Sequence, residues 1–294
     1  WTPIGSTTYD AAEECCFQGV FDGDGHTISG LTLTDGALPY IGLFGRTAEA
    51  EIRDLTVTGL IEIEQDIPND TNTLQYVGGV CGLNTNAILE NVVSDVRIKV
   101  TAEDRAYSGS HLNVGGIVGR NHSGTVKSCV NLNDITVTAK SSNMSQQFNI
   151  GGITGVNGRT RSTIVEINYG TSIVDGCVNK GAVTAENIGT PWVGGVAGAN
   201  YVLGTTKIYN CANYGTVSSN TTAAGGVAGV NRQATVINCY SFGAVSNQAP
   251  YTAYSGGLGG QNTNGGVFQN SYSAGAVSGN SSGGVVGNNY GTTS

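Results

Sequence analysis

Charge and proline are scarce in this chain of 294 residues. Charged side chains make up 12% of it and only 5 residues are proline, whereas charged residues usually account for about 25% of a globular domain. The chain has no basic run and no basic patch interleaved with aromatic residues, so we expect no nucleic-acid partner. No stretch approaches about 18 consecutive apolar residues, so we expect no membrane span in this chain.

Glycine is abundant by contrast, with 46 residues, and much of it falls in a five-residue motif that recurs along the chain. Copies of Gly-Gly-x-x-Gly begin at Gly78, Gly115, Gly151, Gly194, Gly225, Gly256 and Gly283, and a looser copy begins at Ile41. Successive copies start 27 to 43 residues apart. Self-similarity with a period of about 20–50 residues is typical of solenoids, propellers and arrays.

Short apolar segments fill the intervals between the glycine motifs. Residues 52–63 alternate apolar and polar side chains, the period of a strand with one buried face. Later units carry a β-rich piece that ends near Cys or Ser, such as 125–129, and then a third apolar piece, such as 135–137. Polar stretches such as 65–73 and 101–110 indicate loops. Three short strands per unit predict a right-handed parallel β-helix of about eight coils.

Two columns of polar residues support this stacking. A structural ladder is expected from the asparagines two places after the motif's last glycine, which are Asn84, Asn121, Asn157, Asn200, Asn231, Asn262 and Asn289, with Thr47 as the exception. A second column, two places after a cysteine or its replacement, comprises Asn131, Asn179, Asn213, Ser241 and Ser273. In stacked coils, asparagine can occupy the left-handed region and pass side-chain hydrogen bonds along the ladder.

Four of the seven cysteines hold one repeat position: Cys129, Cys177, Cys211 and Cys239. A disulfide framework or metal site is the alternative to a column of buried thiols, but there is no C-x-x-C spacing and seven is odd. We therefore expect small buried side chains that pack the interior. Cys15 and Cys16 are adjacent and lie outside the repeat, which leaves a disulfide or a reactive role open for them.

A family resemblance emerges from these residues. Residues 21–31 (FDGDGHTISGL), 42–45 (GLFG) and 52–55 (IRDL), with the later GGVAG copies, resemble the GLUG-motif repeat. That repeat occurs in bacterial surface and secreted proteins, including some immunoglobulin A metalloproteases, and is similar in architecture to pectin-lyase-like β-helices. The resemblance covers nearly the whole chain and implies an extracellular β-helical segment of a bacterial surface protein. The zinc motif HExxH of those proteases is absent here, so the resemblance implies a scaffold and no chemistry.

The alternative function is a polysaccharide lyase or hydrolase of the pectin-lyase-like type. Such an enzyme needs acids that converge on a groove, and the best candidates are Asp22 and Asp24, helped by Glu62 and Glu64. Aspartate is common in glycine-rich turns, however, and the two glutamates fall on the solvent-exposed face of a strand. We expect no catalytic residues. A weakly bound calcium ion at Asp22 and Asp24 is the one cofactor that the sequence suggests.

Aromatic residues near the cysteine column are the candidate binding residues: Tyr209, Tyr214, Tyr240, Phe242 and Tyr272. If they project outward, they form a stripe that can stack on sugar rings or contact a protein. The alternative is that Tyr and Phe simply fit the faces of β-sheets. The expected partner is a host or matrix glycan or protein.

The organisation that follows is a cap and first rung over residues 1–35 and one continuous repeat domain over residues 36–294. Only seven residues follow the last glycine motif, so we expect the last coil to be incomplete, with unpaired backbone. Two hypotheses account for this end: the natural chain continues, as in a stalk, or the end docks on another subunit in a filament. The function expected is therefore a non-catalytic structural and adhesive module.

Overall fold

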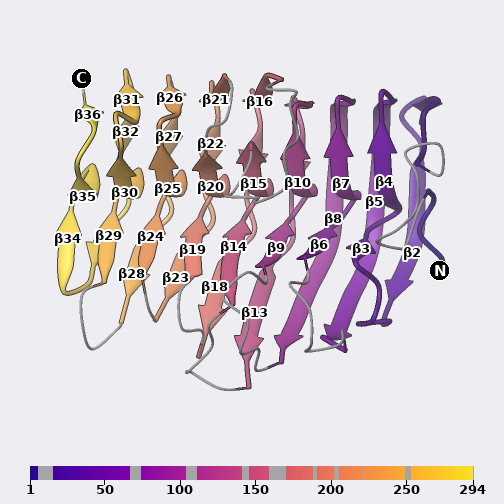
Figure 1. Cartoon of the computed structure of the whole chain (residues 1–294), viewed down its shortest axis with the longest axis horizontal. Helices are drawn as coiled ribbons and strands as arrows, with labels where there is room; N and C mark the ends of the chain where they lie inside the picture. The colour runs from indigo at the N-terminus through magenta and orange to yellow at the C-terminus, as the bar shows by residue number, and fades with distance from the viewer. Residues whose placement is uncertain are drawn as a thin grey trace.

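A computed structural model describes residues 1–5, 16–66, 74–103, 111–140, 146–158, 170–187, 191–201, 205–220, 222–248 and 253–293. In these residues the chain winds into a parallel β-helix of about eight coils, stacked from the N-terminal to the C-terminal end (Figure 1). All pairing between the named strands is parallel and joins one coil to the next. The predicted fold class is confirmed.

Each coil has three sides, and two of them are sheets of eight strands. The first side, sheet C, is built from β3 (Tyr40–Ile41), β6 (Leu74–Gly78), β9 (His111–Gly115), β14 (Gln147–Gly151), β19 (Pro191–Gly194), β24 (Ala223–Gly225), β29 (Tyr254–Gly256) and β34 (Ser281–Gly283). The second side, sheet A, is built from β4 (Phe44–Ala48), β7 (Cys81–Thr85), β10 (Val118–His122), β15 (Thr154–Gly158), β20 (Ala197–Tyr201), β25 (Ala228–Arg232), β30 (Gly259–Thr263) and β35 (Val286–Asn289).

The third side, sheet B, is the longest. It begins with β1 (Val20–Asp22), β2 (Thr27–Leu33) and the unbroken β5 (Glu51–Glu64) and β8 (Ile88–Ala102). From the third coil onward three short strands replace each long one: β11 (Thr125–Lys127), β12 (Val130–Asn131), β13 (Ile135–Ala139), β16 (Ser172–Asp175), β17 (Val178–Asn179), β18 (Val183–Glu186), β21 (Thr206–Tyr209), β22 (Ala212–Asn213), β23 (Val217–Ser219), β26 (Thr235–Ile237), β27 (Tyr240–Ser241), β28 (Val245–Asn247), β31 (Val267–Gln269), β32 (Tyr272–Ser273), β33 (Val277–Ser278) and β36 (Thr292–Thr293).

One detail of the predicted coil was wrong. The piece that ends near Cys and the third apolar piece were expected to form separate sides, but both lie in sheet B, as 125–127 and 135–139 show. The side that the sequence did not reveal is sheet C, formed by the residues just before each glycine motif. Its outward side chains Asn113 and Asn149 are buried, so the strands lack the alternation that normally identifies them.

The glycine motif lies where the chain turns from sheet C into sheet A. A Cβ atom on its first glycine, at Gly115, would lie 2.1 Å from the carbonyl oxygen of Val118. One on its fifth glycine, at Gly119, would lie 2.6 Å from the backbone nitrogen of Val77 in sheet C. Any larger residue would have to displace backbone at both places. The two sheets can therefore fold this closely together only over glycine.

The interior is packed with small and branched apolar side chains. Ile117 at the glycine corner and Val126 and Ile135 of sheet B are fully buried, as are their equivalents in neighbouring coils. Near the C-terminal end Phe268 fills the space that a smaller residue leaves, because a Cβ atom on Gly259 would lie 2.6 Å from its ring. The main core is one continuous column, and a small second cluster of Val156, Ala199 and Val230 packs against Trp192.

The asparagine ladder is confirmed as a stack of side-chain hydrogen bonds. Each Nδ2 donates to the Oδ1 of the next coil over 2.9–3.0 Å, from Asn84 through Asn121, Asn157, Asn200, Asn231 and Asn262 to Asn289. Thr47, the exception in the pattern, donates its hydroxyl to Asn84 over 2.7 Å and so begins the same ladder. The second column is also a ladder, in which Asn131 donates to Asn179 and Asn179 to Asn213, each over 2.8 Å.

The expected left-handed conformation of these asparagines was wrong. The ladder residues lie in extended strands, and positive φ angles fall two places later, at corner residues such as Asn86, Ser123 and Gln233. A residue in a parallel strand needs extended φ to keep its backbone pairing. The sharp turn from sheet A into sheet B then takes the left-handed residue.

The N-terminal region is described in part. Part of the expected cap within residues 1–35, residues 6–15, lies outside the described residues. Ile4 and Phe17 form isolated parallel bridges to Phe44 and Thr47 of β4, and β1 and β2 pair with β5.

Replacement of a corner glycine tests the close approach of sheets A and C. We expect Gly119→Ala to lower the free energy of unfolding by about 1–3 kcal/mol, because its Cβ would overlap the backbone of Val77 and Gly82. Gly284→Ala is the control, since nothing lies within 4 Å of the Cβ position there, and it should stay within about 0.5 kcal/mol of the parent. Urea unfolding measures both; equal losses would contradict the close approach.

Truncation of a ladder side chain tests the hydrogen-bonded stack. Asn121 accepts from Asn84 and donates to Asn157 and to the carbonyl of Gly124. We expect Asn121→Ala to destabilise the fold by about 3 kcal/mol or more, since each buried partner left unsatisfied costs about 1–3 kcal/mol. Asn289→Ala removes the same group at an exposed position, where Oδ1 accepts one bond from the ladder and one from the backbone of Gly291. Its loss, measured by the same denaturation, should be below about 1 kcal/mol.

Candidate functional site

Four of the five predicted binding residues form one exposed cluster on the outer face of sheet B. Tyr214 follows β22, Tyr240 and Phe242 flank Ser241 in β27, and Tyr272 begins β32. Tyr214, Phe242 and Tyr272 are 48%, 43% and 54% exposed, so their rings project outward rather than into the core. We call these four residues the aromatic cluster. The stacking of coils 5 to 7 brings them together from segments about 30 residues apart.

The rings of the aromatic cluster order one another. Tyr214 stacks on Phe242 with centroids 5.3 Å apart, and Tyr240 stacks on Tyr272 with centroids 5.7 Å apart. The two stacks meet edge to face, with Tyr240 and Phe242 at 5.5 Å and 68°. Such pairs contribute about 0.5–1.5 kcal/mol beyond their buried area. A neighbouring phenol, that of Tyr214, raises the pKa of Tyr240 through a hydrogen bond, so Tyr240 is uncharged at neutral pH.

Tyr209, the fifth predicted residue, lies in a different column of sheet B. It pairs in register with Asp175 on one side and Ile237 on the other. Burial and the Asp175 carboxylate raise its pKa. Tyr209 therefore belongs to the charged columns of the N-terminal coils rather than to the aromatic cluster.

That column alternates in charge from one coil to the next. It contains Asp22, Arg53, Glu90, Lys127 and Asp175, placed side by side by the strand register. Arg53 pairs with Asp22 over 2.8 Å and Lys127 pairs with Glu90 over 2.6 Å. Exposed ion pairs of this kind contribute about 0–1 kcal/mol each. Their main effect is to keep like charges from facing each other across the ladder.

The weak calcium candidates lie at the start of this column. Asp22 accepts a hydrogen bond from the Asp24 backbone and the ion pair from Arg53, and these two contacts lower its pKa. Asp24 is a turn residue with a φ of 48°. Within the described residues no group of three or more metal-ligating side chains lies together. Calcium binding here stays a prediction, and the nearest cation to Asp22 is a guanidinium.

The two glutamates considered for catalysis lie on the exposed face of β5. Glu62 forms an ion pair with Lys99 over 2.7 Å, and Glu64 forms one with Lys140. They therefore line no enclosed site with Asp22 and Asp24, which precede β2 at the other end of the same side.

The four column cysteines are fully buried and are not bridged. Three thiols donate to the carbonyl oxygen two residues earlier, over 3.2 Å, at Cys129, Cys211 and Cys239. Burial raises the pKa of Cys129, Cys177 and Cys211 well above the ordinary value of 9.0. Ser271 continues the column and accepts from the Cys239 backbone. Cys16 is also buried, whereas Cys15 lies outside the described residues.

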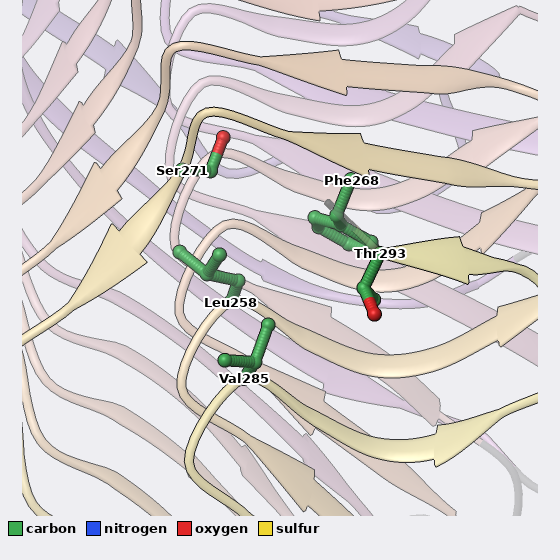
Figure 2. A pocket seen from close by; sticks show the side chains of 5 residues that line it. All are labelled: Leu258, Phe268, Ser271, Val285 and Thr293. Atoms are coloured by element: carbon green, nitrogen blue, oxygen red, sulfur yellow. The ribbon is translucent and has the colours of Figure 1, made fainter.

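A pocket of about 230 Å³ lies at the C-terminal end of the core. Figure 2 shows that Leu258, Phe268 and Val285 line it, together with Ser271 and Thr293. None of these side chains is charged, and none titrates near neutral pH. The pocket extends the apolar core and provides no groups for acid–base chemistry.

The sequence analysis missed a second group of polar residues at the outer corner between sheets C and A. Arginine side chains lie over tyrosine rings there, Arg46 over Tyr40 at 5.1 Å and Arg120 over Tyr76 at 5.9 Å. A third pair, Arg232 over Tyr201 at 4.9 Å, lies within sheet A itself. A signal was present, because each arginine follows the last glycine of a motif copy by one or three places. The angle between the two sheets, which brings the first two pairs together, could not be inferred from that signal.

Thiol labelling tests the buried cysteine column. Because burial raises the pKa of Cys129, Cys177 and Cys211, almost no thiolate is present at pH 8, and we expect iodoacetamide to leave them unmodified in the folded protein. Labelling in guanidinium chloride is the control, and all three should then react. Peptide mapping that finds them modified in the native protein at the rate of a free thiol would contradict the assignment.

No protein-family model, curated protein or solved structure matches this chain. None of the described segments forms a helix that is long and apolar enough to cross a bilayer. What the structure shows of this chain is its architecture, a parallel β-solenoid with three stacked sheets and repeating strands.

Proposed function

We propose that this chain is an extracellular, non-catalytic module of a bacterial surface protein, built from GLUG-type repeats, that presents the aromatic cluster to a glycan. The observation that carries the proposal is the exposure of three stacked or edge-packed rings, Tyr214, Phe242 and Tyr272, on a rigid sheet. Large apolar side chains exposed together on a soluble surface typically mark an interaction site.

The geometry favours a sugar as the ligand. The register places the small side chain of Ala212 beside Tyr240, and Ala274 occupies the equivalent place beside Phe242. Along the sheet, each stack therefore ends on one side at an alanine rather than at another ring. The C–H face of a pyranose can pack on such a ring, while the tyrosine hydroxyls are available to bond its hydroxyl groups. Because the rings are held by one another, little side-chain entropy is lost on binding.

The scaffold supports an adhesive role. Residues of the aromatic cluster are fixed by strands whose inner face is the continuous core, and the ladder asparagine Asn213 lies directly before Tyr214. Binding residues held on rigid strands are positioned more accurately than those on loops. The charged columns of the N-terminal coils keep the remainder of sheet B polar and hydrated.

Glycan binding by matched variants tests the proposal. We expect the double variant Tyr240→Ala, Phe242→Ala to lose at least tenfold in affinity on a glycan array and in calorimetry with the best array ligand, since about 1.4 kcal/mol corresponds to tenfold. Leu132→Ala is the control, because Leu132 is an exposed apolar residue of the same sheet, 41% exposed, in coil 3. It should bind like the parent.

The same polysaccharides distinguish the enzymatic alternative. Reducing-sugar or unsaturated-product release by the parent protein would show that it is a lyase or hydrolase and contradict the non-catalytic assignment. Equal binding by the parent and the double variant would contradict the assignment of the aromatic cluster.

A further inference from the structure

Acidic residues are absent from the last third of the chain. Residues 187–294 contain no Asp or Glu, and their two cations are Lys207 and Arg232. Arg232 ends β25 of sheet A, where its Cζ lies 4.9 Å from the ring centroid of Tyr201. No carboxylate among the described residues forms an ion pair with it. The hydrogen-bond partner that Arg232 does have is a neutral one.

That partner is Asn264, which follows β30 in the next coil. With its oxygen facing the guanidinium, the Asn264 amide accepts from Nε of Arg232 over 3.0 Å and from Nη2 over 3.1 Å. Two donors on one edge of the guanidinium therefore meet a single carbonyl oxygen. Hydrogen bonds from a cation withdraw electron density from the carbonyl carbon and stabilise negative charge that develops on the oxygen.

Gly265 follows Asn264 in the turn that leads from sheet A to sheet B. The two residues have φ angles of 53° and 80°, and the Gly266 amide closes the turn by donating to the carbonyl of Thr263 over 3.0 Å. Both turn residues are exposed, and a Cβ atom on Gly265 would meet nothing within 4 Å. Within the described part of the chain, the amide nitrogen of Gly265 donates to no backbone group. An accessible nitrogen thus lies next to a carbonyl group that Arg232 polarises.

We propose that Asn264 is a site of spontaneous deamidation, promoted by Arg232. The amide nitrogen of Gly265 attacks Cγ of Asn264 and its proton passes through water to Nδ2. The Cγ–Nδ2 bond then breaks and ammonia leaves. A five-membered succinimide ring remains, and a water molecule opens it at either carbonyl to give an aspartate or an isoaspartate at position 264. Water is the one co-reactant, and no electron is transferred.

The two products affect the turn differently. The aspartate keeps the backbone and presents its carboxylate to the same two donors of Arg232, which suits a bidentate ion pair. It is also the first acid in the C-terminal coils. The isoaspartate adds one atom to the backbone of a turn in which Asn262 of the ladder donates to the carbonyl of Gly266 over 3.0 Å. We therefore expect the isoaspartate form, and not the aspartate form, to lower the melting temperature.

A second Asn-Gly pair in the same chain provides an internal control. Asn157 and Gly158 form the only other such pair. Asn157 is fully buried in the ladder, where it accepts from Asn121 over 2.9 Å and donates to Asn200 over 3.0 Å. Its carbonyl meets a neutral amide instead of a cation, and the ladder holds its side chain away from water. We expect no deamidation there while the fold is intact.

Peptide mapping by mass spectrometry, after incubation of the folded protein at pH 8, tests the proposal. We expect Asn264 to exchange NH₂ for OH with time, while Asn157 stays unchanged. In Arg232→Gln the rate at Asn264 should fall by at least about threefold, which is less than the about 100–1,000-fold effect of an enclosed oxyanion hole because solvent also reaches this amide. Arg120→Gln removes an arginine from the same sheet in coil 3 and should react at the parent rate.

Incubation in guanidinium chloride separates the effect of the contact from that of the sequence. Unfolding breaks the contact, so the parent and Arg232→Gln should deamidate Asn264 at equal rates, and Asn157 should then react as well. If Arg232→Gln fails to fold, Arg232→Lys is the test variant, since it keeps the charge, loses the paired donors and should also be slower than the parent. The proposal is overturned if the folded parent shows no change at Asn264, or if the folded variant reacts as fast as the parent.

Discussion

The close contact between sheets C and A at the glycine corner is the constraint on which the remaining structure depends. Without Cβ atoms at the first and fifth motif positions, the two backbones can approach within van der Waals distance. The second glycine then makes room for the second ladder, since a Cβ atom on Gly152 would lie 2.2 Å from Cγ of Asn179. The cross-section that results encloses one apolar core and two asparagine ladders. A repeat that retains these glycines can therefore retain the close contact between sheets C and A.

The asparagine ladders fix the register between successive coils. A shift of one residue in any strand would move a buried amide away from its partner and bring an outward side chain inside. Loop length between the motifs is therefore free to vary, as the spacing of 27 to 43 residues shows, while the strands remain aligned. The same register places aromatic rings in neighbouring coils at stacking distance on sheet B. On the opposite face, the angle between sheets C and A places Arg120 beside Tyr76 of the preceding coil.

Residues that repeat in sequence were predictable, and residues brought together by the angle between sheets were not. The columns containing Asn121, Asn131 and Cys129 could be read from spacing alone, because equal positions in successive coils must stack. Sheet C was missed because burial of its outward residues, such as Asn113, removes the alternation that marks a strand. The contact of Arg120 with Tyr76 depends on how sharply sheet C folds onto sheet A, a property that no spacing encodes. The ring contacts of Tyr214 and Phe242 are an intermediate case. Their shared repeat position could be recognised in the sequence, but the exposure of their side chains could not.

The asparagine ladder also has a direction. Every amide from Asn84 to Asn262 donates toward the C-terminal coil and accepts from the N-terminal one. Their dipoles therefore add along the axis, in the manner of the aligned peptide groups of an α-helix. The interior of this solenoid is electrically polar although it contains no ion, and its C-terminal end carries the positive pole.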